Sequence, residues 1–309
     1  MSVQFDSVAL RGPQQHILPE SDETQAVQPQ AAAPSPAAGA VADGPPYDTK
    51  KLGPDASAPN RSLYNTPDGK PDFTNQKGQP SVNDLNQNGY GDCYFLASIA
   101  SLAQSHPGDI KSMIQDNGNG TFTVTFPHQK DNGITNAWGL FGDRYHDVKV
   151  TVSDKDLPSN AVNADGAPSG EKGTPKWPEV LEAAYAKTHG GYDAIGKGGD
   201  PAKAMEQITG KPAHGYSAGD GAGKIEQALK DGKMVTVSTP EKVGGQDTYD
   251  KNAHKLIGGH AYTVTGIVTE NGKQFVELRN PWGFDQPERI SLDDLAKDGS
   301  IDGVQIGDT

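Results

Sequence analysis

Apolar residues recur at three- and four-residue intervals after Asp92, which predicts an amphipathic helix. The stripe runs as far as Ala103, and Asp92 stands where an N-cap residue is expected. The helix therefore begins at or beside Cys93. Two more helices are predicted after Trp177-Pro178 and Asp200-Pro201, because proline fits the first helical turn and glycines follow both segments.

Strand patterns are concentrated in the last third of the chain. Residues Met234 to Ser238 form a short β-rich run. Two longer runs, Ala261 to Thr269 and Gln274 to Leu278, are joined by a turn that contains Asn271-Gly272, which predicts a β-hairpin. Helices in the first half followed by strands predict an α+β fold.

The hairpin turn decides which residue faces Asn280. A two-residue Asn-Gly loop places Asn280 opposite Thr263, whereas a three-residue loop with a G1 bulge at Gly272 places it opposite Tyr262. Only the second register puts Asn280 on the same face as His260, as a diagonal neighbour at about 7–8 Å. We therefore predict the bulge at Gly272.

The first part of the chain lacks any sustained apolar period. Residues 1–80 are rich in Ala, Pro, Gln, Ser and Asp, and the whole chain of 309 residues is only 33% hydrophobic with a mean hydropathy of −0.66. Such a segment buries too little surface to offset the entropy of ordering. We predict a disordered N-terminal tail over residues 1–80, serving as a linker, prosegment or targeting tail, and a folded domain over 81–309.

Charge and cysteine content exclude several classes of function. With 27 basic and 40 acidic residues the net charge is −13, which repels nucleic acid and anionic membranes. Neither partner is expected. No membrane-length apolar run and no apolar signal-peptide core occur, so classical export is not expected. A single cysteine excludes intramolecular disulfides and multi-thiolate zinc sites.

That single cysteine, Cys93, lies at a predicted helix N-terminus, where a nearby imidazolium would lower the pKa of its thiol. Of the eight histidines, only His260 has two glycines before it and a strand after it, so a rigid element holds its ring. An isolated cysteine is more often a small buried apolar residue than a nucleophile. Local sequence alone leaves both interpretations open.

Three other residues are candidates for the same site. Asn280 ends the partner strand, and its amide can orient an imidazole as in Cys-His-Asn triads, although Asn280-Pro281 also suits a plain turn. Trp282 would shield that hydrogen bond from water. The side-chain amide of Gln87, with the backbone N–H of Cys93, would stabilise an oxyanion; an exposed polar loop residue is the alternative.

Three ordered motifs resemble the calpain family of cysteine proteases. Gln87 to Ala97 resembles the calpain nucleophile segment, Gly259 to Val264 the histidine segment and Arg279 to Gly283 the asparagine segment. Trp177 to Tyr192 is similar to the helix between them. The resemblance covers about residues 85–283. It implies a two-lobed papain-like fold, with the nucleophile helix in a helical lobe and an antiparallel β lobe, acting on protein or peptide substrates through a thioester.

The chain also departs from the family pattern. Tyr94 replaces the usual tryptophan, and the residues after Gly283 do not follow the acidic-aromatic continuation of animal calpains, whose loops bind calcium. We therefore expect no cofactor, with calcium dependence as the less favoured alternative. Four aspartates could in principle bind a cation, but solvated surface carboxylates are the simpler interpretation: Asp116, Asp285, Asp293 and Asp294.

The resemblance favours a cysteine endopeptidase with the triad Cys93, His260 and Asn280. Two other functions use the same fold. A catalytically idle calpain-like module would act by binding alone, and an acyl or amide transferase would use the same triad with an amine acceptor.

Overall fold

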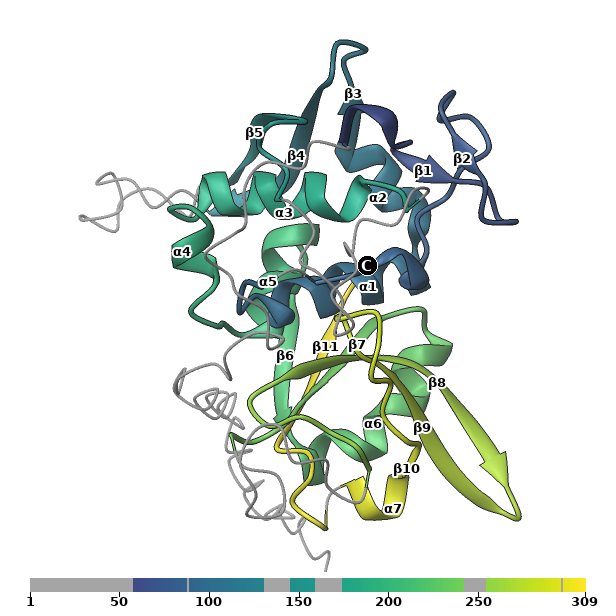
Figure 1. The fold of residues 1–309 in the computed structure, drawn as a ribbon. Coiled ribbons are helices and arrows are strands. Elements are labelled where there is room, and N and C mark those ends of the chain that lie inside the picture. Colours follow the sequence, from purple (N-terminus) through teal and green to yellow (C-terminus); the bar gives the residue numbers. More distant parts are fainter. Residues whose placement is uncertain (1–57, 88, 131–144, 159–173, 242–253, 296) are drawn as a thin grey trace, which may run out of the picture. The chain divides into compact units, whose positions relative to one another are not determined.

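The computed structural model describes residues 58–87, 89–130, 145–158, 174–241, 254–295 and 297–309 (Figure 1). Internal contacts divide the chain into Met1–Ala31 and Ala32–Thr309, and all described residues belong to the second unit. The predicted disordered tail falls largely on residues 1–57, which lie outside the described residues.

The described part contains seven α-helices, two 3₁₀ helices and eleven strands. The helices are η2 (Ala58–Asn60), η3 (Val82–Asp84), α1 (Cys93–Ser105), α2 (Pro107–Met113), α3 (Trp177–Thr188), α4 (Tyr192–Ile195), α5 (Pro201–Thr209), α6 (Ala218–Lys230) and α7 (Leu292–Leu295). The strands are β1 (Tyr64–Asn65), β2 (Pro71–Asp72), β3 (Ile114–Asp116), β4 (Thr121–Lys130), β5 (Tyr145–Ser153), β6 (Ala213–Ser217), β7 (Met234–Ser238), β8 (Ala261–Glu270), β9 (Lys273–Arg279), β10 (Ile290–Ser291) and β11 (Gly303–Gly307). Among the described helices, none has the length and apolar character needed to cross a bilayer.

The strands form three antiparallel sheets. The largest has six strands in the order β10-β9-β8-β7-β11-β6, and the others are β3-β4-β5 and the short pair β1-β2. Helices fill much of the chain before β6, and most of the six-stranded sheet comes from the last third (Figure 1). The mixed helical and antiparallel architecture confirms the predicted α+β class.

Helix α1 is buried along most of its length because it packs between helices on one side and the six-stranded sheet on the other. On one side it contacts α3 and α5, and on the other β7 and β8 (Figure 1). The hydroxyl of Thr263 donates to the carbonyl of Ala97 (2.8 Å), and the N–H of Val235 donates to Ser101 Oγ (2.7 Å). These bonds satisfy polar groups inside the core and fix the helix against the sheet.

The predicted helix boundaries are confirmed, with one difference in capping. The side chain of Asp200 caps α5, and Gly210 ends it in the left-handed conformation (φ 67°). Helix α1 begins at Cys93, but the side chain of Asp92 makes no capping hydrogen bond. Asp92 therefore occupies the predicted N-cap position, but its carboxylate has other partners, described below, and does not cap the helix.

The ordered structure includes residues that the sequence analysis assigned to the tail. Ala58, Leu63 and Tyr64 are buried in the helical core, and Arg61 forms a buried ion pair with Glu179 of α3 (2.8 Å). Residues 58–80 thus pack on the domain although their composition is polar, because a few anchors supply the burial. Ordered structure begins before the proposed boundary at residue 80.

The hairpin of β8 and β9 has the predicted register at its open end, but the bulge that produces it lies elsewhere. Its loop is a two-residue Asn271-Gly272 turn with φ values of 50° and 77°, so the G1 bulge predicted at Gly272 is wrong. A bulge lies within β8 instead, between Val264 and Gly266. Beyond it Thr263 pairs with Arg279, and continuing this register places Asn280 opposite Tyr262, as the analysis required.

Candidate active site

The Cys93 thiol lies at the N-terminus of α1, where that helix meets the six-stranded sheet. Cys93 forms a buried apolar cluster with Ala97 and Ala261, and the backbone of Ala261 donates a hydrogen bond to its sulfur. Ala261 directly follows His260 in the sequence. The structure therefore brings the helix start and the histidine segment together, although 167 positions separate Cys93 and His260 along the chain.

Backbone hydrogen bonds hold His260 at the beginning of β8. Its N–H donates to Thr239 Oγ1, and the N–H of Thr239 donates to the His260 carbonyl, both at 2.9 Å. Gly258 allows the backbone before His260 to pass close to the segment after β7, because a Cβ atom at Gly258 would lie 2.2 Å from the carbonyl oxygen of Glu241. Thr239 supports the site but was not predicted, since a single threonine after a strand carries no recognisable signal.

The Asn280 amide fixes the tautomer of the imidazole. His260 Nε2 lies 2.9 Å from Asn280 Oδ1, which also accepts the N–H of Trp282 at 3.0 Å. Asn280 Nδ2 donates to the carbonyl of Asp285 at 3.2 Å, so both ends of the amide are assigned by their partners. Because Oδ1 is an acceptor, Nε2 carries the hydrogen, and Nδ1 of the neutral ring is left as the basic nitrogen.

Trp282 covers the His260 ring. The two ring centroids are 5.0 Å apart with planes tilted by 54°, and Tyr262 contacts the imidazole edge-on at 4.9 Å. Trp282 is buried, as is Asn280, which is 0% exposed. The aromatic rings lower the local dielectric around the hydrogen bond between His260 and Asn280.

Gln87 is buried next to the segment that carries Asn280 and Trp282, and it is not an exposed loop residue. Its backbone N–H donates to the carbonyl of Pro281 (2.9 Å). Arg279 Nε donates to the carbonyl of Val82 (2.7 Å), which ties the loop before α1 to the end of β9 a second time. Sequence reasoning missed this role of Arg279, because an arginine within a strand gives no sign of its partner.

Burial favours the neutral forms of both titratable groups. Desolvation raises the pKa of the Cys93 thiol to about 12, although backbone hydrogen bonds oppose this shift. Desolvation also lowers the pKa of His260 to about 4, against the hydrogen bond to Asn280. The sequence-based expectation of a lowered thiol pKa is therefore wrong for this structure, in which Cys93 and His260 are only 5% and 6% exposed.

Tyr94, which stands where the family motif has tryptophan, is part of the helical core. It lies edge-on to Tyr185 at 6.4 Å between ring centroids. A Cβ atom at Gly199 would lie 2.6 Å from the Tyr94 ring, so this loop passes directly over the ring. The substitution therefore affects packing around the helix start.

The aspartates considered as cation ligands form local hydrogen bonds where the structure gives their partners. Asp116 accepts from Asn75 and from the N–H of Gly118, and Asp294 accepts from Ser291. Among the described residues, no group of three or more His, Cys, Asp or Glu side chains has an arrangement that would hold a metal ion.

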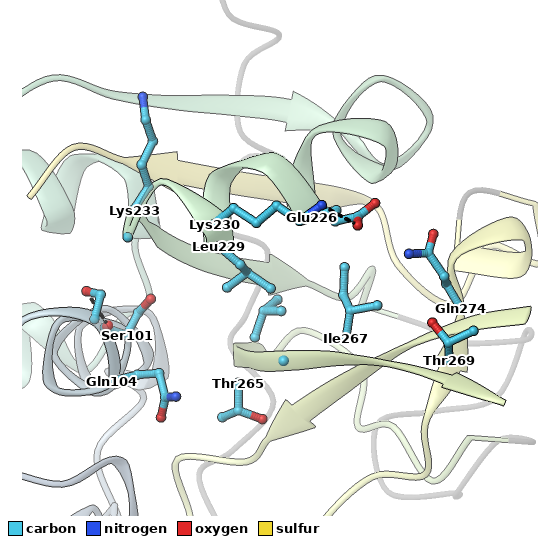
Figure 2. Close-up of a pocket in the computed structure, with 14 residues that line it drawn as sticks. Ser101, Gln104, Glu226, Leu229, Lys230, Lys233, Thr265, Ile267, Thr269 and Gln274 are labelled. Atoms are coloured by element: carbon cyan, nitrogen blue, oxygen red, sulfur yellow. Dashed lines mark hydrogen bonds and ion pairs between the residues drawn. The ribbon is translucent and has the colours of Figure 1, made fainter.

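A cavity of about 480 Å³ lies between α1, α6 and β8, and its lining does not include Cys93, His260 or Asn280 (Figure 2). Figure 2 shows Leu229 and Ile267 beside this space, with Lys230 ion-paired to Glu226 at 2.6 Å. The bulged residue Thr265 also lines it. The cavity is therefore separate from the candidate active site.

A cysteine that opens a buried helix, packed on an antiparallel sheet that supplies a histidine and an asparagine, defines the papain-like class of fold. The family model for calpain family cysteine proteases matches residues 62–288. The chain belongs to the calpain family.

Individual relatives agree with this assignment. Calpain-9 of Mus musculus is 31% identical over 225 residues, covering 69% of this chain and 30% of that protein. The calpain-2 catalytic subunits of Gallus gallus and Homo sapiens are each 31% identical, over 221 and 219 residues, covering 67% of this chain and 29% of theirs. The chain thus spans about 30% of the length of these curated relatives.

Proposed function

We propose that this chain is a cysteine endopeptidase in which Cys93 is the nucleophile, His260 the general base and Asn280 the residue that orients it. The observation that carries the proposal is the buried bond between His260 Nε2 and Asn280 Oδ1 (2.9 Å). It leaves Nδ1 to take the thiol proton, while the hydrogen bond from Ala261 keeps the Cys93 sulfur beside the histidine segment. Protein or peptide substrates follow from the family.

In the proposed reaction the Cys93 sulfur attacks the peptide carbonyl carbon as its proton passes to His260. The tetrahedral oxyanion accepts hydrogen bonds from the Cys93 N–H and the Gln87 amide. Collapse breaks the C–N bond, and His260 gives its proton to the departing amine, which leaves a thioester. Water, deprotonated by His260, then hydrolyses the thioester and restores the thiol.

Because burial raises the pKa of Cys93 and lowers that of His260, both groups favour their neutral forms and the ion pair is not preformed. Entry of substrate or water would reduce the desolvation that opposes both charges. We therefore propose that proton transfer accompanies substrate binding or attack, instead of preceding it.

Cleavage of casein, followed by gel electrophoresis, tests the proposal. Cys93→Ala and His260→Ala are expected to abolish cleavage, whereas His214→Ala, at an exposed position of β6, should retain it. Cleavage is expected to persist in EDTA. Activity that survives in Cys93→Ala would refute the proposal, and incorporation of an added amine in place of hydrolysis would show a transferase.

A further inference from the structure

Two acidic side chains are buried together beside the nucleophile, and the proposed mechanism does not use them. Asp92 immediately precedes α1 and is 0% exposed, while Glu182 of α3 is 2% exposed. Their carboxyl groups are within hydrogen-bonding reach of each other. Two buried carboxylates this close would repel and would both be desolvated, so at least one of them holds a proton.

The same pair contacts the proposed oxyanion donor. Gln87 Nε2 donates to the carbonyl of Tyr90 at 2.6 Å and to Asp92 Oδ1 at 3.3 Å, which uses both of its hydrogens. Gln87 Oε1 is buried without a hydrogen-bond partner. Asp92 Oδ2 is buried with no partner apart from the contact between the Asp92 and Glu182 carboxyl groups. In this conformation, the amide cannot donate to an oxyanion unless it gives up one of these two bonds.

We propose that Asp92 and Glu182 act as a coupled acid pair that positions Gln87 and sets the nucleophilicity of Cys93. This inference rests on the cysteine peptidase function proposed above. While Asp92 is protonated, Gln87 can exchange its longer bond to Asp92 for one to the oxyanion. Once Asp92 ionises, with Glu182 donating to it, the carboxylate holds that N–H more strongly and opposes formation of the thiolate. Both acids are positioning residues.

Titration of the surrounding groups is consistent with this role. Burial raises the pKa of Asp92 to about 7, and the charge of Asp92 in turn contributes to the raised pKa of Cys93. Asp92 is surrounded by other titratable groups from every element packed against it. These are Tyr90 in the preceding loop, Cys93 and Tyr94 on α1, Glu182 and Tyr185 on α3, and Tyr192 on α4. Two further acids, Glu179 and Asp193, lie near these tyrosines. Burial raises the pKa of each of the four tyrosines, so they stay neutral near pH 7.

Because burial raises the pKa of Asp92 to about 7, its charge changes near neutral pH. Below about pH 7 Asp92 is protonated, and the pair opposes neither Gln87 nor Cys93. As the pH rises through that value Asp92 ionises, so kcat is expected to fall. KM should change little, because the competing bond matters only when the oxyanion forms.

The experiment compares pH profiles of casein hydrolysis and of iodoacetamide alkylation, which reports Cys93 alone because the chain has one cysteine. Asp92→Asn should remove the loss of kcat above neutral pH and move the alkylation profile down by about one pH unit. Glu182→Gln still donates to Asp92, so its profiles should stay near wild type. Asp193→Asn, an exposed acid on α4, should also have no effect.

Each outcome decides a separate question. An Asp92→Asn profile that superimposes on wild type would overturn the inference, whatever the peptidase activity. If wild type alkylates as expected but hydrolyses no peptide, the proposed function fails while the pair's effect on the thiol stands. If Asp92→Asn does not fold, Glu182→Leu decides: removing the donor to the Asp92 carboxylate should raise the pKa of Asp92 and move the loss of kcat to higher pH, and no movement would overturn the inference.

Discussion

At the scale of single residues, the site is defined by hydrogen bonds that leave few alternatives. Asn280 uses all its polar groups: its own N–H donates to Gln286 Oε1 (2.9 Å), Oδ1 accepts from His260 and Trp282, and Nδ2 donates to Asp285. A residue this constrained cannot rotate to suit a second His260 position. The imidazole is therefore oriented before any substrate arrives.

Replacement of Asn280 by alanine is expected to lower kcat roughly 10- to 100-fold, which matches the about 1–3 kcal/mol cost of an unmet buried hydrogen bond. KM for a peptide substrate should change little, because the bond orients the base and does not contact substrate. Steady-state kinetics would measure both constants. Asn117→Ala, in an exposed turn, is the control, and an equal loss there would contradict a specific role.

At the scale of elements, the sequence predicted much of what positions the site. The start of α1 at Cys93, the boundaries of α3 and α5, and strands β7 to β9 follow from apolar periods, prolines and glycines, which act locally. The bulge at Thr265 was not predicted, because it depends on how β8 packs between β7 and β9. Asn271-Gly272 forms the two-residue turn that this dipeptide favours, and the extra residue, Thr265, bulges out of β8.

Substitution of Gly258 tests whether the backbone before His260 sets the position of the histidine. A Cβ atom there would lie 2.2 Å from the Glu241 carbonyl oxygen, so Gly258→Ala is expected to displace the backbone before His260. The free energy of unfolding should fall by about 1–3 kcal/mol, as for other overpacked sites, and kcat should fall further than stability alone explains.

Urea denaturation and kinetics on the same variant measure the two effects. Gly266→Ala in β8 is the matched control, because its nearest contact is the flexible end of Glu277 at 3.3 Å. Normal kcat in a folded Gly258→Ala protein would show that the position does not set the histidine geometry.

At the scale of the whole described domain, segments far apart in the sequence close the core. Ala58, Leu63 and Tyr64 are buried in the helical core, although the composition of residues 58–80 alone suggested a tail, because sparse anchors such as Leu63 do not raise average hydrophobicity. The partners of Arg61 are likewise set by tertiary packing: Glu179 and the carbonyls of Thr174 and Pro175 all lie more than 110 positions away.

Removal of the Arg61 charge is expected to destabilise the domain by about 3–5 kcal/mol, because Glu179 would stay buried without its cation. Thermal or urea unfolding of Arg61→Leu would measure this. Lys70→Ala, which breaks an exposed and solvent-screened pair with Asp68, should leave the free energy of unfolding nearly unchanged. Similar small effects in both variants would show that the buried pair is not essential.

The enclosure of Cys93 also bears on its chemical lifetime. Oxidants attack thiolates that solvent can reach, and here burial covers the Cys93 sulfur and raises the pKa of its thiol. A resting molecule would therefore withstand peroxide. Any rearrangement that admits a substrate in the proposed reaction would also expose the sulfur to irreversible oxidation, so the proposed catalysis and oxidative damage to Cys93 would be coupled.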